Sequence, residues 1–210
     1  KQFELPGDFP DDVKKQIESI DPDVIDENST IGRDDYRDIL TVTIDGDDSK
    51  DFDDAVSVKV LDNGNYELGV HIAYVTENSP LDKEALRRAT SIYLVDRVIP
   101  MLPHKLSNGI CSLNPNVDRL ALSCVMEINQ KGDVVSHKIS KSVIRSDMRM
   151  TYKIVNDILK DENSPYRKEY APFINMFEDM LGLRNLLLIK RKRRGSVNFD
   201  LPECEIVLNE

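Results

Sequence analysis

Residues 55–73 read AVSVKVLDNGNYELGVHIA, and this stretch decides the kind of fold that the chain can form. Val56, Val58 and Val60 alternate with polar residues, at the period of two that turns one face of a strand towards a core. Asn63-Gly64 follows, a dipeptide that accepts the positive φ of a two-residue hairpin loop. We therefore predict that residues 55–61 and 66–73 pair as antiparallel strands.

Similar patterns on both sides of this hairpin predict further strands and helices. Leu40, Val42 and Ile44 alternate with polar residues and predict a strand before it. The other elements that we expect are a strand pair over 119–128 and 134–144, a helix over 79–89, a helix over 152–161 capped by Thr151, and a longer helix from Tyr170 to near Gly195. Together they predict a mixed α/β (α+β) fold with an antiparallel-rich β-sheet backed by helices.

Two regions carry weaker patterns. Residues 1–38 are rich in acids and contain three prolines, so we interpret them as a linker with one short helix, on which Val13, Ile17 and Ile20 share a face. Residues 39–210 would then form the main domain. Residues 95–118 read as a long loop rich in Pro, Asn and Ser, and unstructured loops of this length in compact domains are usually functional or disordered.

Composition excludes several classes of protein. Forty per cent of the 210 residues are hydrophobic and 31% are charged, which argues against a disordered polyelectrolyte, and no apolar run approaches the roughly 20 residues that span a membrane. Cys111, Cys124 and Cys204 are odd in number and show no CxxC pairing, as expected of a reduced cytoplasmic chain without a zinc site. The chain begins at Lys1 and ends in a strand-like stretch, which we interpret as a piece of a longer protein.

The net charge of −10 is distributed unevenly. Residues 1–60 contain 7 Lys and Arg against 18 Asp and Glu, whereas residues 61–210 contain 21 against 20. The acidity is therefore local, and it does not exclude a nucleic-acid partner. Residues 190–194 read KRKRR, which indicates either a solvated helix end or a contact with phosphate.

The chemistry of the chain is concentrated in residues 45–54, which read DGDDSKDFDD and include six carboxylates. Such crowding destabilises a fold by repulsion unless a cation neutralises it, and oxygen ligands select Mg²⁺, Mn²⁺ or Ca²⁺. A solvated acidic turn is the alternative. Asp45 ends one expected strand and Asp54 opens the next, so the segment is tied to the core at both ends and we favour metal binding.

Two familiar acidic loops fit less well. An EF-hand counted from Asp45 would place Lys50 where the loop requires glycine. Asp45-Gly46-Asp47 after a strand is similar to the nucleophile motif of haloacid-dehalogenase-type phosphatases, which form an aspartyl-phosphate. That fold alternates parallel strands with helices, whereas this chain continues into a hairpin. An aspartate-nucleophile phosphohydrolase is kept as an alternative.

The same stretch also resembles a known family. Residues 43–55, TIDGDDSKDFDDA, are similar to the first catalytic motif of the RNB domain of the ribonuclease II/ribonuclease R exoribonucleases. The family's order and spacing continue in VHIA at 70–73, YL at 93–94, VIPMLP at 98–103, LSNGICSLNP at 106–115, DRLALS at 118–123, RMTY at 149–152 and RGSVNF at 194–199. The resemblance covers about residues 35–210 and leans towards ribonuclease R.

The resemblance implies a 3′-to-5′ exoribonuclease that hydrolyses RNA to nucleoside 5′-monophosphates. By that analogy the catalytic and metal-binding residues, which hold Mg²⁺ (or Mn²⁺) and the attacking water at a single-stranded RNA 3′ end, are Asp45, Asp51, Asp53 and Asp54. Asp47 and Asp48 are extra acids. Tyr93 corresponds to an aromatic that stacks on the terminal base, with a core tyrosine as the alternative, and Phe199 resembles a second stacking aromatic.

The resemblance also marks departures. Tyr74 stands where the family usually has Asp, and the family's domain continues past the equivalent of Glu210 into an Arg-rich motif. Cold-shock and S1 domains that flank the family's catalytic domain are missing, so we expect this piece alone to be inactive. A non-catalytic RNA- or divalent-cation-binding module is the alternative of a different class. We interpret His71 as a hydrogen-bonded strand residue, and His104 and His137 as surface residues.

Overall fold

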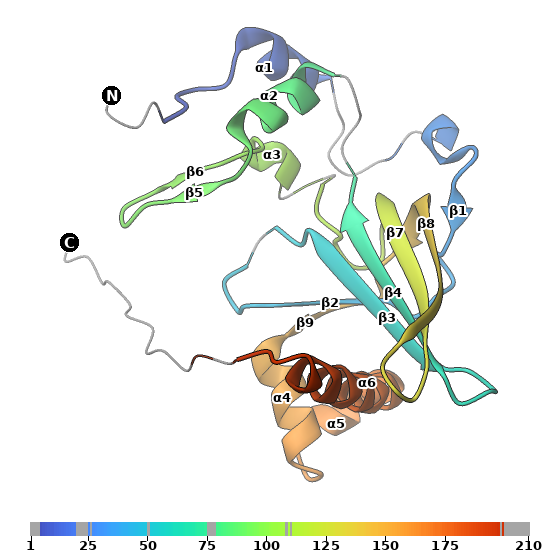
Figure 1. Cartoon of the computed structure of the whole chain (residues 1–210). Helices are drawn as coiled ribbons and strands as arrows, with labels where there is room; N and C mark the ends of the chain where they lie inside the picture. Colours follow the sequence, from blue (N-terminus) through green and yellow to red (C-terminus); the bar gives the residue numbers. More distant parts are fainter. Residues whose placement is uncertain are drawn as a thin grey trace.

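A seven-stranded sheet forms the centre of the computed structural model, which describes residues 5–19, 25, 27–49, 51–74, 79–107, 109, 111–197 and 199 (Figure 1). Its order is β1-β8-β7-β4-β3-β2-β9. These strands are β1 (Asp34–Asp35), β2 (Val42–Asp45), β3 (Asp54–Val60), β4 (Tyr66–Ala73), β7 (Asp118–Ile128), β8 (Val134–Arg145) and β9 (Met148–Thr151). Neighbours pair antiparallel except at the two edges, where β1 joins β8 and β9 joins β2 in parallel.

The two predicted strand pairs are confirmed. β3 and β4 pair in the register Val58↔Leu68, and Gly64 adopts the positive φ of 80° that its turn requires. β7 and β8 form the second antiparallel pair. Because β2 runs directly into the antiparallel β3, the parallel alternation of strands and helices in the haloacid-dehalogenase fold is excluded, and the phosphohydrolase alternative loses its support.

Helices at the end of the chain cover one face of the sheet (Figure 1). They are α4 (Tyr152–Lys160), α5 (Tyr166–Glu169) and α6 (Ile174–Arg193). The main core lies between them and the sheet, with Val42 and Met150 buried against Ile158 and Phe177. Each such side chain contributes about 1.5–3 kcal/mol by leaving water, so this layer fixes the sheet edge where β2 and β9 end.

The residues that predict helix ends in the sequence give the bounds of α4 correctly, but they give only the end of α6 and not its start. The amide of Ile154 donates to Thr151 Oγ1 at 3.3 Å, so Thr151 caps α4 as predicted. The expected helix from Tyr170 begins instead at Ile174, because Pro172 lies in a separate 3₁₀ turn, η2 (Ala171–Phe173), where its missing amide proton is tolerated. Its predicted end near Gly195, where φ is 85°, is confirmed.

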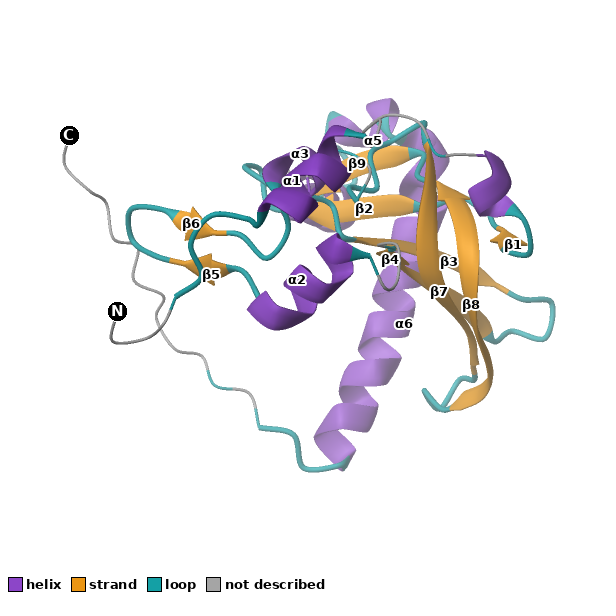
Figure 2. Cartoon of the chain, turned by 90° about the horizontal axis from the view of Figure 1, so that it is seen from above, coloured by secondary structure: helices purple, strands orange, loops and turns teal. Residues whose placement is uncertain are grey.

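A second group of elements, which we call the helical unit, lies beyond one end of the sheet (Figures 1 and 2). It comprises α1 (Asp11–Glu18), α2 (Pro80–Arg88), β5 (Ile92–Tyr93), β6 (Val98–Ile99) and α3 (His104–Ser107), while a 3₁₀ turn, η1 (Glu27–Thr30), precedes β1. A small core of its own buries Val13, Ile17, Leu81 and Leu106. The helix expected within residues 1–38 is thus confirmed as α1, whose partner Ile20 falls outside the described residues.

The structure differs from the long loop expected at residues 95–118. This segment contains β6 and α3, and two leucines within it, Leu106 and Leu113, are fully buried. The elements are two and four residues long, too short for a hydrophobic period to show in the sequence. The helix over 79–89 is confirmed as α2, where the amide of Asp82 donates to the capping Ser79 Oγ at 3.1 Å.

A buried arginine ties the helical unit together. Arg88 donates from Nε to Glu84 Oε1 at 2.7 Å, from Nη2 to the Gly7 carbonyl at 2.7 Å, and from Nη1 to the Pro100 carbonyl at 3.1 Å. Its guanidinium also lies 3.7 Å from the centre of the Phe9 ring. Arg88 therefore joins residues near Gly7, α2 and the end of β6.

None of the helices in the described residues has both the length and the hydrophobicity of a membrane span.

Candidate active site

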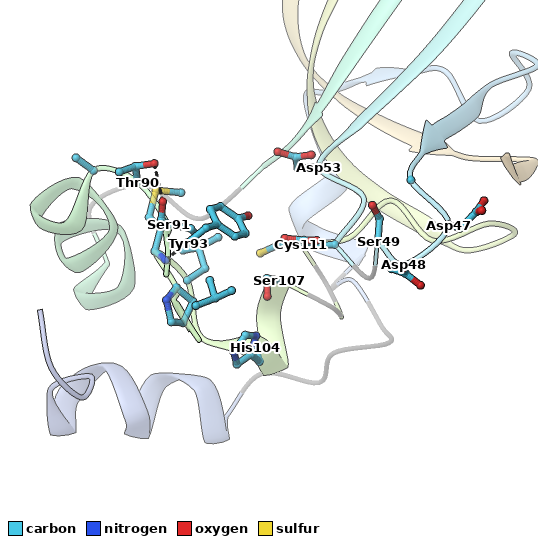
Figure 3. Close-up of a pocket in the computed structure, with 17 residues that line it drawn as sticks. Asp47, Asp48, Ser49, Asp53, Thr90, Ser91, Tyr93, His104, Ser107 and Cys111 are labelled. Atoms are coloured by element: carbon cyan, nitrogen blue, oxygen red, sulfur yellow. Dashed lines mark hydrogen bonds between the residues drawn. The ribbon is translucent and has the colours of Figure 1, made fainter. Parts of the chain in front are cut away.

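A cleft of about 830 Å³ lies between the helical unit and the loop that connects β2 to β3 (Figure 3). We call residues 46–53 the acidic loop. Its side of the cleft is lined by Asp47, Asp48, Ser49, Asp51 and Asp53. The facing wall comes from the helical unit and includes Tyr93, Ser91, His104 and Ser107. The cleft thus joins carboxylates from one part of the fold to an aromatic ring and hydroxyl groups from another.

Backbone hydrogen bonds fix the second half of the acidic loop. Phe52 is 5% exposed; its amide donates to Ser112 Oγ at 3.0 Å, and its carbonyl accepts from the amide of Leu113 at 2.7 Å. The carbonyl of Asp53 accepts from the amide of Ala73 at 2.8 Å. Burying the one apolar side chain of the loop therefore holds its neighbouring aspartates at the end of the sheet.

The first half of the loop is held by Arg149 on β9. Arg149 Nη2 donates to the carbonyl of Asp47 at 2.8 Å and to that of Ser49 at 3.2 Å, with a longer contact of 3.5 Å to Gly46. Its guanidinium carbon lies 4.9 Å from the centre of the Phe52 ring. The sequence showed Arg149 only as part of a family motif, without a role, and no local signal links it to partners about 100 residues earlier.

The predicted catalytic acids repel one another. Burial raises the pKa of Asp45, the charges of Asp54 and Asp53 raise it further, and Arg149 lowers it. Burial and the charge of Asp53 also raise the pKa of Asp54. The neighbouring carboxylates are thus close enough to Asp45 and Asp54 to disfavour the charged form of these two side chains. Asp45 Oδ2 is in addition buried without a hydrogen-bond partner, which is the state of a group that suits a cation.

The fit to a divalent cation rests on this donor chemistry. The available donors are carboxylate oxygens, which suit Mg²⁺ and Mn²⁺, and Asp45 Oδ2 is free to bind one. Among the residues that the structure describes, no three His, Cys, Asp or Glu side chains already form a metal-binding group. The carboxylates therefore meet at one end of the sheet without forming a closed coordination shell, and metal binding by the four aspartates stays a prediction.

The structure separates the remaining predicted site residues. Tyr93 is 74% exposed and lies on the cleft wall that faces Asp53, so it is not the core tyrosine of the alternative interpretation (Figure 3). Phe199 is 80% exposed and does not line the cleft, so its role stays a prediction. Asp47 and Asp48 lie towards the tip of the acidic loop, away from Asp53. His104 is exposed as expected, but it also lines the cleft.

His71 is a buried, hydrogen-bonded strand residue, as predicted. Its Nδ1 lies 2.6 Å from Ser123 Oγ, which lies 2.5 Å from Ser142 Oγ, and Nε2 lies 3.4 Å from Ser57 Oγ. Ser142 Oγ donates onward to the Ala121 carbonyl at 3.2 Å. Burial lowers the pKa of His71 to about 4. His71 therefore packs within the sheet in its neutral form and contributes nothing to the cleft.

Two other positions singled out in the sequence have defined surroundings. The ring of Tyr74, where the sequence departs from the motif it resembles, has the Arg33 guanidinium 4.7 Å and the Lys141 ammonium 5.3 Å from its centre. Cys111 borders the cleft as a free cysteine, and burial raises the pKa of its thiol to about 11. Cys124 is free as well, and Cys204 lies outside the described residues.

Comparison with known proteins shows the family of the chain. The family model described as the RNB domain matches residues 33–210. The chain belongs to the RNB family. This RNB chain is 51% identical over 212 residues to Ribonuclease R 1 of Lactococcus lactis subsp. lactis, covering 99% of the chain and 26% of that relative. It is 48% identical to Ribonuclease R of Thermotoga maritima, covering 98% and 29%.

Solved structures place the RNB chain in the same fold. It superposes on Mycoplasma genitalium RNase R in complex with ribose-methylated single-stranded RNA with a TM-score of 0.84 at 32% identity, covering 98% of this chain and 32% of that one. The predicted resemblance to the ribonuclease R branch and the predicted α+β fold are both confirmed. The RNB chain spans between a quarter and a third of the length of these relatives.

Proposed function

We propose that this RNB chain carries the carboxylate centre of a 3′-to-5′ exoribonuclease, which hydrolyses single-stranded RNA to nucleoside 5′-monophosphates with Mg²⁺ or Mn²⁺. The observation that carries the proposal is a cleft in which Asp51 and Asp53 lie on one wall and the exposed Tyr93 on the other, while the charge of Asp53 raises the pKa of Asp45 and Asp54 at the adjoining strand ends. Ribonuclease R relatives that cover almost the whole chain, and a solved relative bound to single-stranded RNA, support it.

The cleft itself explains why a cation is needed. Among its described lining residues there is no Lys or Arg, so an RNA phosphate would meet uncompensated carboxylates. Asp45 and Asp54 at the two strand ends, with Asp51 and Asp53 between them, would hold the cation. A bound Mg²⁺ would lower the pKa of a water molecule and balance charge on the phosphate oxygens.

The wall that faces the acidic loop suits the bases at the 3′ end of the RNA. Tyr93 offers an exposed ring on which a base can stack, and stacking accepts any base, as an enzyme that removes successive nucleotides requires. Ser91 borders the same wall and can donate a hydrogen bond to a phosphate or ribose oxygen. The aromatic wall thus orients the chain end, while the acidic loop carries the groups that act on the bond.

The test uses the protein at its natural full length. Asp53→Asn keeps the shape of the side chain but removes its charge, so single-turnover hydrolysis of single-stranded RNA should be lost while RNA binding stays near wild type. Asp47→Asn, towards the loop tip, is the matched control and should remain active. An Asp53→Asn protein that releases mononucleotides at the wild-type rate would contradict the proposal, and a wild-type protein that only binds RNA would support the non-catalytic module.

A further inference from the structure

We infer that Arg149 is a positioning residue that holds the acidic loop in the shape its carboxylates need to bind a divalent cation. The inference rests on the proposed function. Arg149 is the described residue that joins both halves of the loop: it contacts the carbonyls of Gly46, Asp47 and Ser49, and its guanidinium lies over the ring of Phe52. It reaches them from β9, where parallel pairing places it opposite Thr43 on β2.

Few other hydrogen bonds of the described residues hold the first half of the acidic loop. Within residues 46–49, the backbone hydrogen bond is a single turn from the amide of Ser49 to the Gly46 carbonyl at 3.2 Å. Residues 46–48 are exposed and include two aspartates beside the four predicted catalytic ones, so repulsion favours an open loop. A planar guanidinium that reaches several carbonyls offsets this tendency, because each charge-assisted hydrogen bond fixes one more backbone group.

Arg149 does this without forming an ion pair with the aspartates. In the described residues it forms no ion pair of 4.0 Å or less, and its Nε is buried without a partner. Its donated hydrogen bonds go to carbonyl oxygens instead. The carboxylate oxygens are therefore left available for a cation, while the backbone that carries them is fixed.

Charge and geometry give opposite expectations, which makes the inference testable. If Arg149 acted only as a nearby positive charge, removing it would tighten binding of a divalent cation, because like charges repel. If it positions the loop, removing it loosens the ligands and weakens binding, as loss of outer groups that orient metal ligands commonly does. Lysine keeps the charge but lacks the planar guanidinium, which lies over the Phe52 ring while its Nη2 reaches the carbonyls, so Arg149→Lys isolates the geometric contribution.

The experiment compares Arg149→Lys and Arg149→Met with wild type in the full-length protein. Free Mn²⁺ measured by electron paramagnetic resonance gives the affinity, hydrogen exchange reports on residues 46–49, and steady-state kinetics on single-stranded RNA separate kcat from KM. Both variants should bind Mn²⁺ roughly 10-fold more weakly or worse, exchange faster in the loop, and lose at least about 10-fold in kcat with KM for RNA within about twofold.

Arg145→Met is the matched control, because Arg145 is an exposed arginine whose partner is Asp118, away from the acidic loop. It should leave Mn²⁺ affinity and loop exchange unchanged. Mn²⁺ affinity in Arg149→Met equal to or tighter than wild type would overturn the inference, as would an Arg149→Lys protein with wild-type kcat. Failure of the proposed function is seen separately, as a wild-type protein that does not hydrolyse RNA with Mg²⁺ or Mn²⁺.

Discussion

Lowering the pH should destabilise this protein through His71, which is 1% exposed. Protonating the ring would place a charge on a buried side chain whose hydrogen-bond partners are the neutral hydroxyls of Ser57 and Ser123. Burial accordingly lowers the pKa of His71 to about 4. The unfolded chain exposes the same ring, which then titrates near its ordinary value of about 6.5.

The size of the effect follows from these two values. Above pH 6.5 the ring is neutral in both states and the stabilising difference is fully present. Between about pH 6.5 and 4 the unfolded state takes up a proton that the folded state refuses, so the free energy of unfolding falls with pH. Relative to pH 7.5, the expected loss is about 2 kcal/mol at pH 5 and about 3 kcal/mol at pH 4, a large share of typical domain stability.

Urea unfolding of wild type and His71→Gln at pH 7.5, 6 and 5 measures this loss. The variant is less stable at pH 7.5, but it lacks the titrating group, so the gap between the two proteins should narrow by about 2 kcal/mol at pH 5. His137→Gln, which removes an exposed histidine from β8, should keep the wild-type slope. A gap that stays constant with pH would refute the reasoning, as would an NMR titration of the wild-type His71 ring near pH 6.5.

Three further predictions concern the cleft and the sheet. Tyr93→Ala should weaken the grip on a 3′ base by about 1–3 kcal/mol and leave longer limit fragments on a gel, while Tyr93→Phe behaves as wild type; identical products from all three would exclude stacking. Mg²⁺ at ten times its Kd should stabilise wild type by about 1.4 kcal/mol, a rise in Tm of about 3–6 °C that EDTA reverses, and equal stabilisation of Asp53→Asn would count against the site. Gly69→Ala should cost about 1–3 kcal/mol in urea unfolding, because its Cβ would overlap Ser57 Oγ and lie 2.8 Å from His71 Nε2, whereas Gly7→Ala, in open space, should be neutral.

Local chemistry explains which parts of the fold could be predicted from the sequence. Asn63-Gly64, Ser79 and Thr151 act within four residues of their own positions, so the hairpin, α2 and α4 were predictable. The acidic stretch of residues 45–54 is also a local feature, so it could be recognised in the sequence as the candidate site that lines one wall of the cleft. Pro172 carried a readable signal as well, but the apolar period of the helix continued across it and hid the break.

Long-range pairing explains what could not be predicted. The role of Arg149 depends on the parallel pairing of β2 with β9, which joins positions about 100 residues apart and leaves no periodic trace. The wall that carries Tyr93 consists of elements of two to four residues, which are stabilised by burial of Leu106 rather than by their own propensity. The sequence could therefore show which residue types matter, but not which ones meet.

The position of β2 between β3 and β9 has a consequence for biosynthesis. The four predicted catalytic aspartates leave the ribosome before Ser112 and Arg149, which hold their loop and lie 60 and about 100 residues further along the chain. Contacts of such separation form only after the intervening segment has been made. For a protein that we propose acts on RNA, the carboxylates thus stay loosely arranged while the nascent chain is still beside ribosomal RNA and its own message, and the cleft is completed only after β9 has emerged.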